Sequence, residues 1–273
     1  MTRDFTRDSF LVIDIKYSMR KQQKKPFTGK VALVTGGSRG LGAATVRMLA
    51  KQGADVAFTY HSSRGLADTV VEDVRTKGSK AVALRSDQAD TGGATVLIDE
   101  VVAYLGGLDI LVNNAAISVE QGRTVDDPDA DTAAQDRMHA TNYLGVIALT
   151  RAAAKVMRNN GRIISISSGL GTLVGLPGLA DYSATKSGIE RYTAGAARDL
   201  GPRGITANVV QAGLMESPTM KPPPEVLEAM VSSLSLKRVA DPDEIAAAVV
   251  FLASPAASYI TGVKLDANGG YNA

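Results

Sequence analysis

The sequence has no cysteine and no tryptophan, and only two of its 273 residues are histidine. Without cysteine, the chain can form neither a disulfide framework nor a thiolate metal site, and two isolated histidines are too few for a typical zinc site. We therefore predict that the protein has no metal site. Any redox chemistry would have to come from an organic cofactor, because the chain contains no thiol pair.

Long apolar runs are also missing. No segment approaches the roughly 20 apolar residues that a membrane-spanning helix needs. The apolar stretch FLVI at 10–13 is short, is flanked by Asp8 and Asp14, and is not followed by a small-residue cleavage site, so it is a poor signal peptide. We expect a cytoplasmic protein with no membrane partner, and we interpret residues 1–28 as a flexible N-terminal extension.

Excess positive charge is confined to the start of the chain. Residues 1–30 hold eight Lys and Arg against three acids, although the whole sequence has a net charge of only +2. The body, 31–273, therefore has 22 basic and 25 acidic residues. A mildly acidic body lacks the basic stripe that a nucleic-acid surface needs, so we predict no nucleic-acid partner.

What the chain does have is a regular alternation of two kinds of segment. Short runs rich in β-branched residues alternate with stretches whose apolar residues recur at helical spacing. The runs are almost continuously apolar, as in strands that helices cover on both faces. We predict that residues 29–273 form a single-domain α/β fold, a doubly wound parallel seven-stranded sheet of the Rossmann type. The expected strands are 31–35, 55–60, 80–86, 108–112, 162–167, 205–210 and 262–267.

One irregular stretch follows the sixth expected strand. Residues 213–236 include the run KPPP at 221–224, which cannot continue a helix or the interior of a strand. Ligands of such sheets bind at the carboxyl ends of the strands, so we interpret 213–236 as a mobile lid over that crevice. A plain surface loop is the alternative.

A glycine-rich turn, TGGSRGLG at 35–42, lies between the first expected strand and the first expected helix. It lacks the Gly-Lys-Ser/Thr ending of a Walker A loop, and its glycines follow G-x-x-x-G-x-G rather than the usual dinucleotide spacing. Glycines there still let backbone N–H groups approach a pyrophosphate over a helix N-terminus. A tight structural turn is the alternative.

The choice of cofactor is expected to depend on the end of the second strand. An acid there would bind the ribose 2′-hydroxyl and repel a 2′-phosphate, but the position is Tyr60. No carboxylate occurs from Val56 to Ala67. We therefore predict NADPH/NADP in preference to NADH/NAD. The candidate phosphate contacts are Arg39, His61, Ser62 and Ser63, each of which could also be an ordinary exposed polar residue.

The stretch YSATK places Tyr182 and Lys186 on one face of a helix. An ammonium beside a phenol favours phenolate, so we expect the pKa of Tyr182 to be lowered, which would make it an acid/base. A surface pair is the alternative. Ser167 or Ser168 emerges at the carboxyl edge of the fifth expected strand, where ligands bind, and we favour Ser168, just past the strand; Asn142 is a polar residue in an otherwise helical pattern.

Several of these motifs occur together in one order. TGGSRGLG, NNAA at 113–116, Asn142, SISS at 165–168, YSATK and the closing segment 237–270 resemble the classical short-chain dehydrogenase/reductase family, over about residue 29 to the C-terminus. The resemblance implies that Tyr182 exchanges the proton at the carbonyl oxygen and that Lys186 binds the nicotinamide ribose. It also implies that Ser168 bonds the substrate oxygen and that Asn142 supports a water near Lys186.

The resemblance implies further contacts with the cofactor. Asp87 and Gln88 would contact the adenine, Asn114 would lie near the adenosine ribose, and Leu214 and Ser217 would lie by the nicotinamide amide. With those of the glycine turn and the second strand, the predicted cofactor-binding residues are Gly36, Ser38, Arg39, Leu41, Gly42, Tyr60, His61, Ser62, Ser63, Asp87, Gln88, Asn114, Ala115, Tyr182, Lys186, Gly213, Leu214 and Ser217.

The sequence departs from the family pattern at two cofactor-side positions. Ala116 stands where N-N-A-G would have glycine, and Ala212 where Pro-Gly would have proline. The interval from Ser168 to Tyr182 is also slightly long. None of these changes removes a catalytic group, so they bear on cofactor affinity and lid rigidity.

The function predicted from these features is an NADPH-dependent oxidoreductase that transfers a hydride between the nicotinamide and a ketone or secondary alcohol. The closest general resemblance is to 3-oxoacyl-(acyl carrier protein) reductases, which we keep as an alternative to a small or medium apolar ketone. A silent nucleotide-binding sensor or scaffold is an alternative of another class. The family also implies a homotetramer or homodimer.

Overall fold

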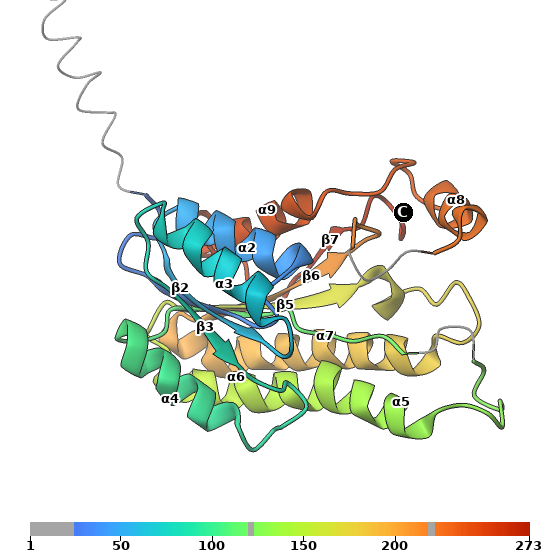
Figure 1. The fold of residues 1–273 in the computed structure, drawn as a ribbon, viewed down its shortest axis with the longest axis horizontal. Coiled ribbons are helices and arrows are strands. Elements are labelled where there is room, and N and C mark those ends of the chain that lie inside the picture. Colours follow the sequence, from blue (N-terminus) through green and yellow to red (C-terminus); the bar gives the residue numbers. More distant parts are fainter. Residues whose placement is uncertain (1–24, 120–122, 218–221) are drawn as a thin grey trace, which may run out of the picture.

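The structure is a computed structural model that describes residues 25–119, 123–217 and 222–273 (Figure 1). Most of the predicted N-terminal extension and the middle of the predicted lid lie outside the described residues. At the start of the described chain, Phe27 is 1% exposed and packs into the core beneath the sheet's first helix. The boundary between the expected extension and the folded part stays a prediction.

Within the described residues, a seven-stranded parallel sheet has the order β3-β2-β1-β4-β5-β6-β7. From β1, the chain adds β2 and β3 on one side of the sheet and β4 to β7 on the other. This switch in strand order creates a crevice between the carboxyl ends of β1 and β4. The predicted fold class is confirmed, because each expected strand run contains or overlaps an observed strand. The strands are β1 (Val31–Val34), β2 (Asp55–Tyr60), β3 (Ala81–Arg85), β4 (Ile110–Asn113), β5 (Arg162–Ser168), β6 (Thr206–Ala212) and β7 (Lys264–Ala267).

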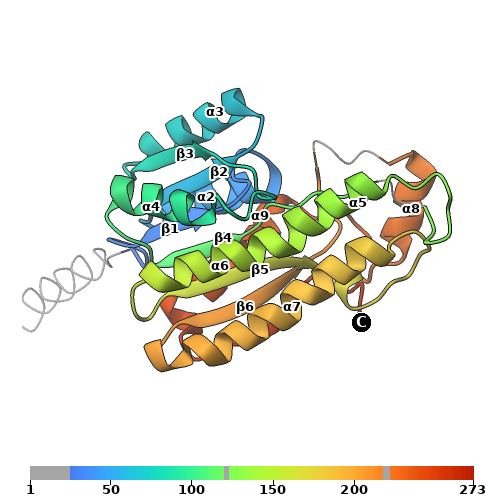
Figure 2. The same cartoon turned by 90° about the horizontal axis from the view of Figure 1, so that it is seen from below.

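Helices cover both faces of the sheet (Figures 1 and 2). One layer holds α2 (Gly40–Lys51), α3 (Arg64–Arg75) and α9 (Pro242–Ala253); the other holds α4 (Ala94–Leu105), α6 (Gly145–Val156) and α7 (Ala180–Leu200). A separate cluster of buried apolar side chains lies under each layer. Burial on both faces explains why the strand sequences are apolar throughout rather than alternating.

The second layer is extended along one side of the molecule (Figure 2). Helix α5 (Thr132–His139) continues into α6 through a π-helical turn at Ala140–Leu144 (η1), so that one long rod lies beside α7. A 3₁₀ turn at Gly169–Gly171 (η2) follows β5. In the part of the chain that the structure describes, no helix has the length and apolar character needed to cross a membrane.

The predicted lid contains a helix that the sequence reading did not expect. Helix α8 (Pro224–Ser232) begins with proline at its first position, where the missing N–H costs nothing. None of its residues is buried. The KPPP run therefore precedes a helix rather than excluding one, and motion of 213–236 stays a prediction.

Candidate active site

The glycine turn between β1 and α2 is tightly packed against its neighbours. A Cβ at Gly37 would lie 2.6 Å from the Cβ of Phe58, and one at Gly42 would collide with the carbonyl oxygen of Gly36. Gly36 itself has φ of +67°, which side chains disfavour. The Asn114 amide donates to the Thr35 carbonyl at 2.8 Å, so this predicted cofactor residue also holds the turn closed.

The N-terminus of α2 suits an anion. Arg39, the residue before the helix, has extended backbone, and no described side chain caps the helix. The first intrahelical bond on this end is donated by Ala43 to the Arg39 carbonyl, so the N–H groups of Gly40, Leu41 and Gly42 have no partner within the helix. Backbone donors at a helix N-terminus, approached through side-chain-free glycines, fit a pyrophosphate.

We expect Gly42→Ala to weaken both folding and cofactor binding. The added methyl group would collide with the Gly36 carbonyl and come within 2.7 Å of the Asn114 amide, so the turn must open. Overpacking of this kind costs about 1–3 kcal/mol. Urea unfolding and NADPH titration measure the two losses. Gly65→Ala is the control, because nothing lies within 4 Å of a Cβ there, and an equal loss in both variants would contradict the prediction.

Polar side chains at the ends of β2 and β3 surround the place expected for a 2′-phosphate. His61 and Ser62 are exposed and Ser63 is half-buried, and none of these three is held in a core contact. Arg39 is also exposed. The residue aligned with Tyr60 across the parallel pair is Arg85, whose guanidinium donates to the His61 carbonyl at 3.3 Å. The structure thus adds a guanidinium that the sequence analysis did not single out.

Asp87, the one carboxylate of the predicted cofactor residues, is already paired. Arg137 of α5 donates to both carboxylate oxygens at 3.2 and 3.1 Å, and His61 Nε2 lies 3.9 Å away. Partial burial alone would raise the pKa of Asp87, but the Ala89 N–H, Arg137 and His61 together hold it below its usual value. Sequence reasoning missed Arg137 because it is 50 residues from its partner and belongs to no motif.

Helix α7 brings Tyr182 and Lys186 to the end of β5. Lys186 is 3% exposed and its ammonium donates to the Ile166 carbonyl at 3.1 Å, while its Nζ lies 5.7 Å from the centre of the Tyr182 ring. Ser168 lies close enough to the Tyr182 hydroxyl to act on the pKa of Tyr182. The surface-pair alternative is therefore wrong. Ser168 is the last residue of β5, and it is half-buried, whereas the neighbouring Ser167 points into the core.

The expected lowering of the Tyr182 pKa is wrong for this structure. Burial raises the pKa of Tyr182, and the hydrogen bond with Ser168 opposes that rise only in part. Burial also lowers the pKa of Lys186 to about 8, against the opposing charge of Glu190. The sequence reading counted the ammonium beside the phenol but not the loss of water around both groups, which disfavours each charged form.

Asn142 lies in the π-helical turn η1 and faces inward. Its side-chain oxygen accepts from the Ile117 N–H and its amide donates to the Ile117 carbonyl, both at 2.8 Å. Its amide is also 3.4 Å from the Thr185 hydroxyl, one residue before Lys186. Asn142 is 1% exposed, so it does not face water. π-Turns of this kind are frequent at functional sites.

The remaining predicted residues divide between the two sides of the crevice. Gly213 follows β6, and a Cβ there would collide with Asn268. Leu214 is half-buried and accepts from the Ala240 N–H at 3.0 Å, and Ser217 is the last described residue before 218–221. Gln88 packs its backbone against Gly145, and its side-chain nitrogen is buried without a partner among the described residues.

Comparison with known proteins agrees with this geometry. A family model described as enoyl-(acyl carrier protein) reductase matches residues 36–272. The chain is 40% identical over 246 residues to the 3-oxoacyl-[acyl-carrier-protein] reductase FabG of Staphylococcus aureus strain Mu50, which covers 88% of this chain and 97% of that protein. The chain belongs to the short-chain dehydrogenase/reductase family. It is therefore an NAD(P)-dependent oxidoreductase by family.

Solved structures of the same family include cofactor complexes. A short-chain dehydrogenase from Burkholderia cenocepacia J2315 in complex with NADP has a TM-score of 0.87 and 40% identity, covering 91% of this chain and 100% of that chain. A blue fluorescent protein from a metagenomic library, in complex with NADPH, has a TM-score of 0.86 and 39% identity, with the same coverages.

Several apolar side chains lie on the segment that connects β5 to α7 and on the one that follows β6. Leu173, Val174 and Leu176, on the segment between β5 and α7, are 49%, 53% and 62% exposed. Met215 packs partly against the core, and Met220 lies outside the described residues. These three side chains are therefore exposed apolar surface on the segment that leads into α7.

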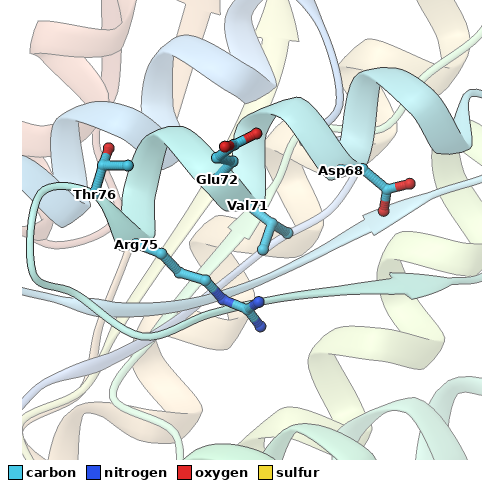
Figure 3. A pocket seen from close by; sticks show the side chains of 5 residues that line it. All are labelled: Asp68, Val71, Glu72, Arg75 and Thr76. Atoms are coloured by element: carbon cyan, nitrogen blue, oxygen red, sulfur yellow. The ribbon is translucent and has the colours of Figure 1, made fainter.

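Two pockets differ in their relation to these residues. A small one is lined by Met138, Leu179, Asp181 and Tyr182, beside the catalytic phenol. A larger one, about 330 Å³, lies against the outer part of α3 (Figure 3). Its lining comes from one helix, Asp68 to Thr76, whose C-terminal end runs toward the opposite edge of the sheet from the glycine turn. Of the two pockets, only the smaller one is lined by a predicted catalytic residue, Tyr182.

Proposed function

We propose that the protein is an NADPH-dependent reductase of ketones, reversible as a secondary-alcohol dehydrogenase. The observation that carries the proposal is the meeting of Tyr182, Ser168 and Lys186 at the carboxyl end of β5, beside a glycine turn shaped for a pyrophosphate. A bound nicotinamide would supply or accept the hydride. The side chains of this protein would bind the substrate and transfer the proton.

In ketone reduction, Ser168 and Tyr182 would bond the carbonyl oxygen, and Tyr182 would donate its proton as negative charge develops there. Burial supports this direction, because a raised pKa keeps the Tyr182 phenol protonated at neutral pH. Lys186 would bind the nicotinamide ribose from its buried position. Asn142, fixed to Ile117, would hold a water that connects Lys186 with solvent.

Preference for NADPH is supported by the charges around the end of β2. Tyr60 replaces the acid that would repel a 2′-phosphate, and Arg39, His61, Ser62 and Ser63 are free of core contacts. Asp87 is paired with Arg137, whose Nη2 lies within 3.2 Å of both carboxylate oxygens, so this carboxylate does less to repel a phosphate. Both cofactor complexes named above contain the phosphorylated form.

For the substrate, the exposed apolar trio of Leu173, Val174 and Leu176 favours a small or medium apolar ketone. The second candidate is a 3-oxoacyl group on acyl carrier protein, favoured by the name of the 40% identical FabG relative. The two candidates differ in whether reduction depends on a carrier protein. A carrier-protein substrate would be reduced much faster than its short thioester analogue, whereas a free ketone would be reduced without any carrier.

The cofactor proposal is tested by titrating the protein with NADPH and NADH and following nicotinamide fluorescence. Hydrogen bonds to charged groups contribute about 1.5–3 kcal/mol each, so Arg39→Ala combined with Ser62→Ala should weaken NADPH binding by about 10²- to 10⁴-fold. NADH binding should be unchanged. Arg198→Ala, an exposed arginine in the last turn of α7, is the control. Equal binding of both cofactors by the unaltered protein would refute the phosphate site.

A further inference from the structure

Behind Lys186, the structure contains a second charged side chain that the reaction described above does not use. Glu190 lies one helical turn after Lys186, on the same face of α7. Its Oε1 accepts hydrogen bonds from the Ser167 hydroxyl at 2.7 Å and from the Gln211 amide at 2.5 Å. Its side chain is 14% exposed. Burying a charge costs free energy, so a carboxylate this enclosed is expected to have a structural or catalytic role.

The contacts of Glu190 join the elements that carry the catalytic residues. Ser167 directly precedes Ser168 in β5, and Ile166, one residue earlier, accepts from the Lys186 ammonium. Lys186 and Glu190 of α7 therefore bond to successive residues of β5. Gln211 links the same carboxylate to β6 and donates also to the Thr172 hydroxyl at 2.7 Å.

We propose that Glu190 is a positioning residue, whose carboxylate fixes the end of β5 against α7 and keeps Lys186 in its ammonium form. The inference rests on the proposed function, which it deepens. Glu190 touches neither substrate nor cofactor, and acts through Ser167 and Lys186. The sequence analysis did not single it out, because its partners lie on β5 and β6 rather than in its own motif.

The charges around this pair support an electrostatic role. Burial lowers the pKa of Lys186, and Glu190 is the charge that acts to raise it again. On the far side of the carboxylate, Lys264 Nζ of β7 is 4.0 Å from Glu190 Oε2. The elements β5, β6 and η2 present the neutral Ser167, Gln211 and Thr172.

Other titratable groups near α7 are engaged elsewhere. His139 of α5 lies 2.9 Å from Asp181, at the start of α7, and Arg151 of α6 interacts with Tyr192 further along it. Tyr182 is the other titratable neighbour of Lys186, at 5.7 Å from ring centre to Nζ. With Tyr182 present in every variant, a change in Lys186 titration on removal of Glu190 would report the carboxylate.

Glutamine and alanine separate the two parts of the proposal. Both hydrogen bonds end on Oε1, so Glu190→Gln can keep them with its amide oxygen while removing the charge. Glu190→Ala removes charge and hydrogen bonds together. Lys264→Gln is the matched control, because it removes a charge of opposite sign from the other side of the carboxylate.

The test follows the titration of Lys186 by NMR in protein labelled with ¹³C at lysine Cε, with the signal assigned by its loss in Lys186→Met. An opposite charge nearby shifts a pKa by at least about one unit, so Glu190→Gln should move the midpoint of Lys186 from about 8 to lower pH by that amount. The sign follows because a negative neighbour favours the ammonium. Lys264→Gln should not lower the midpoint.

Activity supplies the second measurement. In Glu190→Gln, the upper limb of the pH profile of kcat should move to lower pH, while kcat at pH 6 stays near that of the unaltered protein. In Glu190→Ala, kcat should fall about tenfold at pH 6 and across the upper limb. An unshifted Lys186 midpoint in Glu190→Gln overturns the proposal, as does an alanine variant with unaltered kcat. The NMR titration needs no substrate, so failure of the proposed function would show separately, as an unaltered protein that reduces no ketone.

Discussion

Tyr182→Phe is expected to lower kcat/KM for ketone reduction by about 10³-fold, within the 10²- to 10⁴-fold range of general acid catalysis. The substitution removes only the hydroxyl, which lies near Ser168 and would bond the substrate oxygen. The ring that packs at the end of α7 is kept, so NADPH binding should be unchanged. Steady-state kinetics on a ketone panel and fluorescence titration of NADPH measure the two quantities.

Tyr192→Phe provides the control for that substitution. Tyr192 lies on the same helix and is also half-buried, and burial raises its pKa as it does that of Tyr182, but its neighbours are Arg151, Asp199 and Tyr143. We expect this variant to keep full activity. A Tyr182→Phe protein that retained more than about a tenth of kcat/KM would identify a different proton donor, because general acid catalysis contributes at least about 10²-fold.

The fold was predictable because its signals are local. Seven apolar runs, separated by stretches whose apolar residues recur at helical spacing, were enough to indicate a parallel sheet. The runs at 31–35 and 55–60 match β1 and β2 to within one residue. Helix α8 was missed because three prolines indicate a break, while the third, Pro224, is the first residue of that helix. Composition could not distinguish a proline that ends an element from one that begins it.

The candidate site was predictable only as far as its motifs reach. Tyr182 and Lys186 are an i, i+4 pair, so their shared face follows from helix geometry. The pairing of Asp87 with Arg137, and of Glu190 with Ser167 and Gln211, joins segments 50, 23 and 21 residues apart and depends on how layers pack. The error about the Tyr182 pKa has the same origin, because burial depends on the packed structure. Assembly as a homotetramer or homodimer stays a prediction, since it requires surfaces of a second chain.

Lys186→Met is expected to have opposite effects on activity and stability. Loss of the ammonium removes a preorganised charge beside the reacting groups, so kcat should fall by about 10²- to 10³-fold. The folded protein, in contrast, should gain stability. Burial lowers the pKa of Lys186 from 10.5 to about 8, which means that folding disfavours the charged form. Methionine has a similar shape and carries no charge to desolvate.

The sign of the stability effect depends on pH in a defined way. Below about pH 8 the lysine is charged in both states, so the full cost of burying the ammonium is present; it fades as pH rises toward 10.5 and the unfolded chain also loses the proton. Replacing a buried charge by an apolar group stabilises by about 1–4 kcal/mol, and the Ile166 carbonyl and Glu190 left behind reduce that gain, so we expect about 1–2 kcal/mol at pH 7.

Urea unfolding of the cofactor-free protein at pH 7 and pH 10 measures this difference. The gain should be smaller at pH 10, and Lys155→Met, at an exposed lysine in the last turn of α6, should show none at either pH. If Lys186→Met were less stable at pH 7, the bonds of the ammonium to Ile166 would outweigh its desolvation. A gain in stability with a loss of activity would mean that Lys186 is kept for catalysis at the expense of the fold, as expected of a buried charge at an active site.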